Sequence, residues 1–269
     1  MYNTLFKGFG IISILIFLFA CGSSNNNSDV LRVGVQVGPE YKLAEAAKKV
    51  AKDKYNLEVE LITFNDYVMP NEALNQKDLD VNVFQTRPYL EDQSKNRGYQ
   101  LEVIGNTFVY PMAGYSKKIK NVKELKSGDN IVIPNDPTNL GRALLLLQDA
   151  GIIKLKSNIG LLPTQQDIVE NPIPVEIIEL EAPQIPRTLD DNKVVVAIIN
   201  NNFAASVGLI SNKDGIFVEN EKSPYVNIVV SRKDNKDDKK VQDFLKSYQS
   251  EEVEKAAEQE FKGGAIKGW

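Results

Sequence analysis

The stretch that decides the fold class is Leu31-Arg32-Val33-Gly34-Val35-Gln36-Val37, which is followed by Gly38-Pro39-Glu40. Over 31–37, apolar residues alternate with polar or small ones, as they do in a β-strand. Gly38-Pro39 then ends the strand. Proline suits the first turn of a helix, and Glu40 places an acid near the positive end of the helix dipole. Because the apolar residues over 43–51 share one helical face, the stretch predicts a strand followed by a helix that packs against it.

Strands and helices keep alternating along the rest of the chain. We expect further strands at 57–64, 81–84, 101–110, 131–134 and 225–231, and two buried strands at 175–180 and 194–199. Helices are expected at 71–76, from residue 88, at 139–150, and over one long segment from about 236 to 261 that Gly263-Gly264 ends. This order predicts an α/β protein with a mostly parallel sheet covered by helices. A second cycle after Tyr110 predicts two lobes around a cleft.

Composition removes several classes of function. With 269 residues, 42% of them hydrophobic and 25% charged, the chain has the composition of a globular protein of about two domains. The net charge of −4 argues against a broad nucleic-acid-binding surface. The absence of histidine excludes His-dependent nucleophiles and His-ligated metals, and a single cysteine excludes an internal disulfide and a thiolate metal cluster. Without a nucleotide-binding glycine loop or a calcium loop, we expect no catalytic residues, cofactor or metal site.

The first thirty residues predict export and lipid attachment. Lys7 precedes an apolar run over 9–19, which is too short to cross a bilayer as a helix and matches a secretory signal peptide. The end of the run, Ala20-Cys21, resembles the bacterial lipobox, which implies that residues 1–20 are removed and Cys21 is lipidated; a buried core cysteine is the alternative. Residues 21–30 then form a polar tether. We therefore expect an extracytoplasmic protein held at the membrane by a lipid on Cys21.

The strongest local signal for a ligand site is Pro134-Asn135-Asp136-Pro137-Thr138-Asn139-Leu140-Gly141-Arg142, between a strand and an apolar helix. Asp136 or Thr138 can cap this helix. Arg142 is expected in the first turn, where a cation opposes the helix dipole and needs another partner. A bound carboxylate would supply one through two parallel hydrogen bonds. A neighbouring acid would serve equally well, and the spacing favours neither interpretation.

Two further groups of candidate residues occur at strand ends. Phe84 and Tyr89, with Tyr67, could form an aromatic wall for an apolar or thioether side chain, although ordinary core packing explains them as well. The asparagines Asn200, Asn201 and Asn202 directly follow the strand at 194–199, where their amides could pair with both an ammonium and a carboxylate or simply belong to a polar turn. Asn227 lies within an apolar strand and needs a partner if buried, because an unsatisfied amide costs about 1–3 kcal/mol.

Several longer stretches carry a family resemblance. They are Thr63-Phe64-Asn65-Asp66-Tyr67, Pro70-Asn71-Glu72-Ala73-Leu74, Gly105-Asn106-Thr107-Phe108-Val109-Tyr110-Pro111, the segment 135–142, Glu181-Ala182-Pro183-Gln184 and Ser223-Pro224-Tyr225-Val226-Asn227. In these stretches the chain closely resembles the NlpA/MetQ family of methionine-binding lipoproteins. The resemblance implies a type II periplasmic-binding-protein fold. Residues 31–110 and 225–269 would form lobe 1, residues 111–224 would form lobe 2, and one amino acid would bind between them.

The resemblance also implies roles for individual residues. Tyr67, Phe84 and Tyr89 would surround the ligand side chain. The carboxylate would bind Arg142, and the polar end would contact Asn200 and Asn227. Thr86 stands where the family commonly has histidine; it is shorter and cannot become cationic, which leaves room for a water molecule or a different ligand atom. Phe203 stands where tyrosine is common.

The function implied is the capture of L-methionine or a related amino acid for an ABC importer, whose permease is driven by a cytoplasmic ATPase. A methionine-containing dipeptide or D-methionine is an alternative ligand, which the change at Thr86 makes worth testing. Two other classes stay open. One is a surface adhesin or antigen with an empty cleft, and the other is an extracytoplasmic enzyme, against which the lack of histidine argues.

Overall fold

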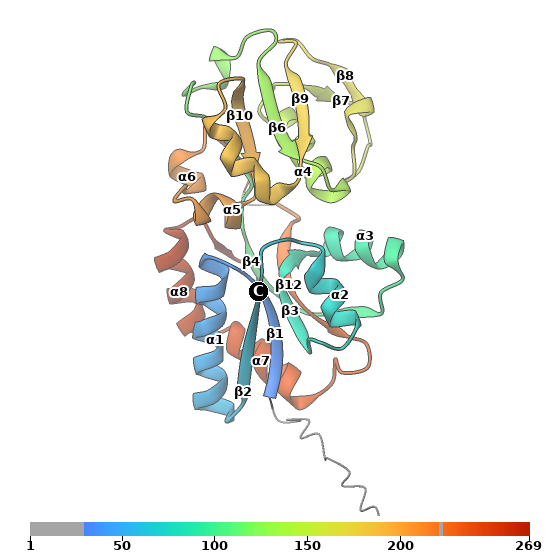
Figure 1. Ribbon diagram of the computed structural model, residues 1–269, viewed down its shortest axis with the longest axis vertical. Helices are drawn as coiled ribbons and strands as arrows, with labels where there is room; N and C mark the ends of the chain where they lie inside the picture. Colours follow the sequence, from blue (N-terminus) through green and yellow to red (C-terminus); the bar gives the residue numbers. More distant parts are fainter. Residues whose placement is uncertain (1–29, 221–222) are drawn as a thin grey trace, which may run out of the picture.

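Two β-sheets organise the molecule, one in each half of its long axis (Figure 1). The computed structural model describes residues 30–220 and 223–269. The predicted signal peptide, Cys21 and tether residues 22–29 lie outside these residues. We call the six-stranded sheet with its helices lobe 1, and the five-stranded sheet with its helices lobe 2. Within the described ranges, no helix has the length and apolar character needed to cross a bilayer.

Lobe 1 is built from both ends of the described chain. Its first part contains β1 (Val30–Gln36), α1 (Pro39–Tyr55), β2 (Glu58–Phe64), α2 (Met69–Asn75), β3 (Val81–Thr86), α3 (Arg87–Arg97) and β4 (Leu101–Val109). Its second part contains β12 (Val226–Arg232), α7 (Lys239–Tyr248), α8 (Glu251–Phe261) and β13 (Ile266–Lys267). The strand order is β13-β4-β12-β3-β1-β2, with α1, α7 and α8 on one side of the sheet and α2 and α3 on the other (Figure 1).

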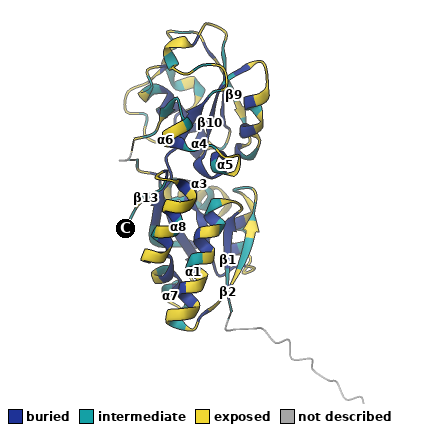
Figure 2. Cartoon of the chain, turned by 90° about the vertical axis from the view of Figure 1, so that its left-hand side faces the viewer, coloured by how far each residue is buried: buried dark blue, intermediate teal, exposed yellow. Residues whose placement is uncertain are grey.

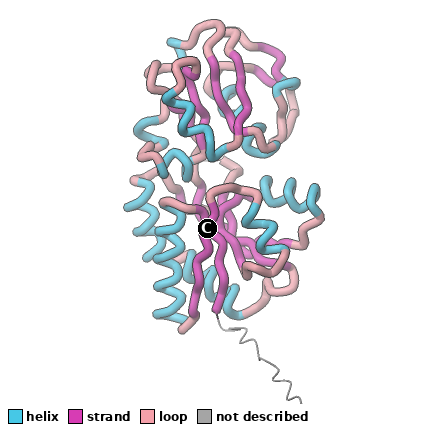
Figure 3. Tube along the Cα trace, viewed as in Figure 1, coloured by secondary structure: helices cyan, strands magenta, loops and turns pink. Residues whose placement is uncertain are grey.

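Lobe 2 is formed by the intervening chain. Its strands are β5 (Ala113–Tyr115), β6 (Asn130–Pro134), β7 (Lys154–Leu155), β8 (Ile168–Glu170), β9 (Glu176–Leu180), β10 (Val194–Ile199) and β11 (Phe217–Val218). Its α-helices are α4 (Pro137–Asp149), α5 (Asn201–Ser206) and α6 (Ser211–Asp214), and its 3₁₀ helices are η1 (Val122–Glu124), η2 (Gln165–Asp167) and η3 (Ala182–Asp190). The main sheet has the order β11-β5-β10-β6-β9, and β7 pairs with β8. Loops make up more of lobe 2 than of lobe 1 (Figure 3).

The structure corrects three expectations about the elements. The sheets are mixed rather than mostly parallel, because β12 runs antiparallel to both β3 and β4, and β5 runs antiparallel to β10. The strand expected to be buried at 175–180 is β9, an edge strand with no fully buried residue. The single long terminal helix is two helices, α7 and α8, because Ser250 starts a new helix by accepting a hydrogen bond from the Val253 backbone.

The opening strand and helix form as their sequence predicts. Pro39 begins α1, and Asn56 ends it in the left-handed conformation, with φ of 51°. Leu43, Ala47 and Val50 lie on the buried face of α1, which packs against the sheet of lobe 1 with α7 and α8. Figure 2 shows this buried face turned inward and the exposed residues on the outside. The carboxyl end of β1 and the start of α1 thereby point toward lobe 2 (Figure 1).

The first turn of α1 carries a buried acid. Glu40 is 4% exposed, and its Oε2 has no hydrogen-bond partner among the described residues. Burial raises the pKa of the Glu40 carboxyl to about 8. Two buried phenols, Tyr110 and Tyr248, interact electrostatically with it, and burial raises the pKa of both hydroxyls. A carboxyl group in these surroundings is mostly protonated at neutral pH.

We predict that Glu40 makes folding stability fall as pH rises from the ordinary carboxyl pKa of 4.5 to about 8. In this window the folded protein keeps a proton that the unfolded chain has released, so this carboxyl weakens the fold by up to about 1.4 kcal/mol per pH unit. Glu40→Gln keeps the neutral shape and should flatten that slope in urea unfolding between about pH 5 and about pH 8. The control is Glu45→Gln on the exposed face of α1, which should leave the slope unchanged. Equal slopes in wild type and Glu40→Gln would contradict the prediction.

Candidate functional site

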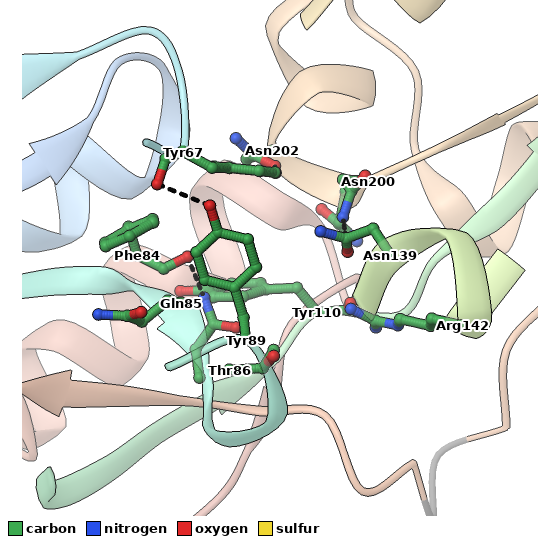
Figure 4. Close-up of a pocket in the computed structure, with 12 residues that line it drawn as sticks. Tyr67, Phe84, Gln85, Thr86, Tyr89, Tyr110, Asn139, Arg142, Asn200 and Asn202 are labelled. Carbon is green, nitrogen blue, oxygen red and sulfur yellow. Dashed lines mark hydrogen bonds between the residues drawn. The ribbon is translucent and has the colours of Figure 1, made fainter. Parts of the chain in front are cut away.

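A cavity lies between the lobes, where the carboxyl ends of β3 and β10 meet the first turns of α3, α4 and α5. Ligands of α/β proteins usually bind at the carboxyl ends of the strands. The cavity contains about 380 Å³ of unfilled space, including its opening. Its lining includes all the ligand residues that the sequence singled out: Tyr67, Phe84, Thr86, Tyr89, Arg142, Asn200 and Asn227. The remaining lining residues are Gln85, Tyr110, Asn139, Asn201 and Asn202 (Figure 4).

One wall of the cavity is aromatic. The Tyr67 ring centroid lies 6.0 Å from that of Phe84 and 6.1 Å from that of Tyr89, and Phe203 lies 5.1 Å from Tyr67 on the other lobe. Phe84 and Tyr89 pack edge to face at 6.1 Å. Tyr67, Phe84 and Tyr89 therefore pack on one another and also line the cavity, so both interpretations of them from sequence describe part of the structure. An apolar or thioether side chain would find a complementary surface here.

Two tyrosine hydroxyls on this wall have different partners. Tyr67 donates a hydrogen bond of 2.6 Å to Asn202 Oδ1, which crosses from lobe 1 to lobe 2. Tyr89 donates a hydrogen bond of 2.9 Å to the Tyr67 carbonyl, which stays within lobe 1. Burial raises the pKa of both hydroxyls above the ordinary range, so both stay protonated and able to donate. The hydrogen bond between Tyr67 and Asn202 therefore joins the two lobes directly.

Arg142 is the one charged side chain among the described lining residues. It lies in the second turn of α4 rather than the first, so the helix dipole does not explain its need for a partner. The partner is Glu219, 77 residues along the chain, whose carboxylate accepts hydrogen bonds from Nε at 2.9 Å and from Nη2. Nη2 also donates to the Tyr110 carbonyl at 2.9 Å, and the guanidinium lies 4.5 Å from the centre of the Tyr225 ring. The ion pair is nearly buried, with side-chain exposures of 5% and 10%.

This pairing changes what Arg142 can offer a ligand. The expectation was a pair of parallel hydrogen bonds to a ligand carboxylate, but the Nε–Nη2 edge of the guanidinium is already occupied by Glu219. The hydrogen bonds of Arg142 to the described residues leave Nη1 unused. Arg142 extends from α4 toward the cavity in Figure 4. A ligand carboxylate can therefore bind through Nη1 while the acid stays in place.

Amide side chains supply the remaining polar groups. Asn200 donates to Asn139 Oδ1 at 2.7 Å, and its own Oδ1 is buried without a partner among the described residues. Asn139 in turn donates to Asp136, the residue that caps α4. Asn227 donates to the Phe84 carbonyl at 3.2 Å, which gives this buried strand amide one of the partners it needs. A buried acceptor such as Asn200 Oδ1 would gain from a ligand donor.

Thr86 ends β3 and directly precedes α3, but its side chain does not cap that helix. Its backbone pairs with Asn227 on β12, so the residue lies at the junction between the two strands. It is partly exposed and lines the cavity. Thr86 therefore lines the cavity at the position where the sequence departs from the family pattern.

Sequence reasoning missed several residues of the cavity. Tyr110 and Asn139 lie inside stretches quoted above, but the sequence holds no signal that separates them from their neighbours. Asn201 and Asn202 belong to the asparagine run for which a ligand role is one of the two interpretations from sequence. Gln85 looks like a strand residue, yet it exchanges amide hydrogen bonds with Asn71. Nothing in the sequence around Glu219 indicates that it pairs with Arg142. Within the described ranges, no group of acid or cysteine side chains is arranged to hold a metal ion.

The chain is similar to known proteins in both sequence and structure. The NlpA lipoprotein family model matches residues 31–269. The D-methionine-binding lipoprotein MetQ of Escherichia coli strain K12 is 57% identical over 267 residues, covering 98% of each chain. The crystal structure of the methionine binding protein MetQ is 60% identical with a TM-score of 0.88, covering 90% of this chain and 98% of that one. A nutrient binding protein from Burkholderia cenocepacia, bound to methionine, is 44% identical with a TM-score of 0.86, covering 89% of this chain and all of that one. These matches confirm the predicted family and the two-lobed fold.

We predict that Tyr67→Phe shifts the lobes toward an open arrangement. The substitution removes the Tyr67–Asn202 hydrogen bond, one of several that join the lobes, and leaves Asn202 Oδ1 without its donor, at a cost of about 1–3 kcal/mol to the closed form. Small-angle X-ray scattering of the ligand-free protein should therefore report a larger radius of gyration. Tyr89→Phe is the matched control, since it removes a hydroxyl bond within lobe 1 and should leave the scattering unchanged. An unchanged profile for Tyr67→Phe would refute the assignment of this bond as a latch.

Proposed function

We propose that this chain, which belongs to the NlpA lipoprotein family, captures methionine outside the cytoplasm and delivers it to an ABC importer. The observation that carries the proposal is the cavity between the lobes, where an aromatic wall faces the Arg142 guanidinium and the amides of Asn200 and Asn227. Such a site has one apolar half and one polar half. An amino acid with a long apolar side chain has the same two halves.

The polar and apolar contacts together account for tight capture. The thioether side chain would lie against Tyr67, Phe84 and Tyr89, and burying it contributes about 1.5–3 kcal/mol. The carboxylate would accept hydrogen bonds from Arg142 Nη1, and each charge-assisted bond contributes about 1.5–3 kcal/mol. The ammonium would donate to Asn200 Oδ1, the acceptor that lacks a partner among the described residues. No single contact is sufficient, so the ligand must satisfy both halves of the cavity.

Capture is coupled to closure of the lobes. We propose that residues 31–110 with 225–269 and residues 111–224 move as two domains about the two passages of the chain between the sheets. Ligand contacts come from both lobes, so they favour the closed form by their differential affinity for it. Closure also forms the bond between Tyr67 and Asn202. The closed lobes would then dock on a permease driven by a cytoplasmic ATPase.

Attachment to the membrane would come from the N-terminus. We propose that Cys21 carries the lipid and that residues 22–29 act as the tether, which keeps the binding lobes on the extracytoplasmic side. The proposed role is transport rather than catalysis, in keeping with the family to which the chain belongs. D-Methionine and methionine-containing dipeptides are the other candidate ligands. Thr86 lines the cavity where the family commonly has the larger histidine, so space is left for a different ligand atom.

We predict that Arg142→Lys weakens methionine binding at least about tenfold, because lysine keeps the charge that Glu219 needs but has no second donor group to offer the ligand. Arg142→Ala is the poorer test, since it would leave the Glu219 carboxylate buried and unpaired. The measurement is calorimetric titration of protein stripped of ligand by unfolding and refolding. Its ligands are L-methionine, D-methionine, glycyl-methionine and leucine.

Arg187→Lys, an exposed position on lobe 2, is the matched control and should bind like wild type. Wild-type affinity in Arg142→Lys would refute the carboxylate site. A wild-type protein that binds none of the four ligands would refute methionine capture and favour a protein-binding surface instead.

A further inference from the structure

The Arg142–Glu219 pair sets the charge of the cavity before any ligand enters. Arg142 is the single charged side chain among the described lining residues, and its nearest charge is the Glu219 carboxylate. Both side chains are nearly buried, so little water screens the attraction between them. The pair is therefore neutral as a unit. A free carboxylate entering this cavity meets a guanidinium whose charge is already balanced.

A second acid lies behind the polar wall. The carboxylate of Asp136 accepts hydrogen bonds from the Asn139 backbone at 3.0 Å and from Thr138 Oγ1 at 2.9 Å. Its charge reaches the cavity, since it raises the pKa of Tyr67 and Tyr89 there, although burial of the two hydroxyls is the larger cause. Burial also raises the pKa of the Asp136 carboxyl, against the hydrogen bonds that lower it. Once the Arg142–Glu219 pair is counted as neutral, the lining side chains carry no net positive charge.

Glu219 is also fixed to the passages between the lobes. Its Oε2 accepts a hydrogen bond of 3.2 Å from the Met112 backbone N–H, and its own N–H donates to the Met112 carbonyl at 2.9 Å. Met112 follows β4 on the first passage, whereas Glu219 follows β11 on the second. The carboxylate that holds Arg142 is therefore anchored by the backbone of the hinge. This anchoring gives the guanidinium one position, with Nη1 left for the ligand.

We propose that Glu219 is a positioning residue that sets charge selectivity: by neutralising Arg142, it makes the site select a zwitterionic amino acid over an anion with the same side chain. A zwitterion brings an ammonium with its carboxylate and leaves the buried site without added net charge. A monoanion would bury one uncompensated negative charge, which a low-dielectric cavity disfavours. This inference rests on the proposed function, because it assumes that the ligand carboxylate binds at Arg142.

The test compares three ligands that differ in charge but keep the methionine side chain. They are L-methionine, which is zwitterionic, methylthiobutanoate, which lacks the amino group and is an anion, and L-methioninamide, which lacks the carboxylate and is a cation. Wild type should prefer methionine over methylthiobutanoate in calorimetric titration. Glu219→Gln keeps the size of the side chain but removes its charge, so the ratio of the two affinities should move about tenfold or more toward the anion. The affinity for methioninamide, relative to that for methionine, should fall in Glu219→Gln.

Glu181→Gln is the matched control. Glu181 is an exposed acid on lobe 2 that accepts a hydrogen bond from Asn135, and its removal should leave all three affinities in their wild-type ratio. If Glu219→Gln does not fold, Glu219→Asp is measured instead. This substitution keeps the negative charge but shifts its position. All three ligands should therefore bind more weakly, while the ratios of their affinities stay as in wild type.

The outcomes separate the two proposals. A uniform loss of affinity in Glu219→Gln, or a changed ratio in Glu219→Asp, would overturn the charge-selecting role and leave a structural one. A wild type that binds methylthiobutanoate as tightly as methionine would overturn it too, while methionine capture would stand. A wild type that binds none of the three ligands would remove the proposed function itself, and the inference with it.

Discussion

A guanidinium withdrawn from water needs a carboxylate, and the position of that carboxylate constrains the rest of this molecule. Arg142 leaves α4 in lobe 2, Glu219 lies on the passage back to lobe 1, and Met112 on the other passage supports it. Removing one partner of such a buried pair usually costs about 3–5 kcal/mol, so the pair keeps α4 in contact with both passages. Arg142 and the aromatic wall lie on opposite sides of the cavity (Figure 4).

The sequence contains enough information to find most of the cavity. Residues at strand ends, such as Phe84 on β3 and Asn200 after β10, lie at the carboxyl ends of strands in two separate sheets, and both line the cavity between the lobes. The partners of these residues could not be found in the same way. Glu219 is 77 positions from Arg142 and Asn139 is 61 positions from Asn200, and only tertiary packing decides such pairs. The expected turn of Arg142 was wrong because α4 begins at Pro137, two residues earlier than the apolar pattern suggested.

The helices and strands show the same contrast: features that depend on neighbouring residues could be predicted, and features that depend on tertiary packing could not. The period and the cap of α1 are local, so its bounds could be predicted closely. The break between α7 and α8 was missed because apolar residues recur on both sides of it, while the stop depends on Ser250 capping the next helix. The antiparallel direction of β12 could not be predicted, because it depends on which strands the returning chain meets. Strand direction is a property of the connection rather than of the strand.

The place of β12 has a consequence for the order in which the chain can fold. β12 lies between β3 and β4 in the middle of the lobe 1 sheet, although it comes from the last part of the sequence. Until it arrives, those two strands present unpaired edges, which readily pair with other chains. The strands of lobe 2 all come from residues 113–218, so its sheet does not depend on a segment that is synthesised much later. The lobe that begins first during synthesis is therefore the last to be completed, and premature release would expose a half-built sheet to aggregation.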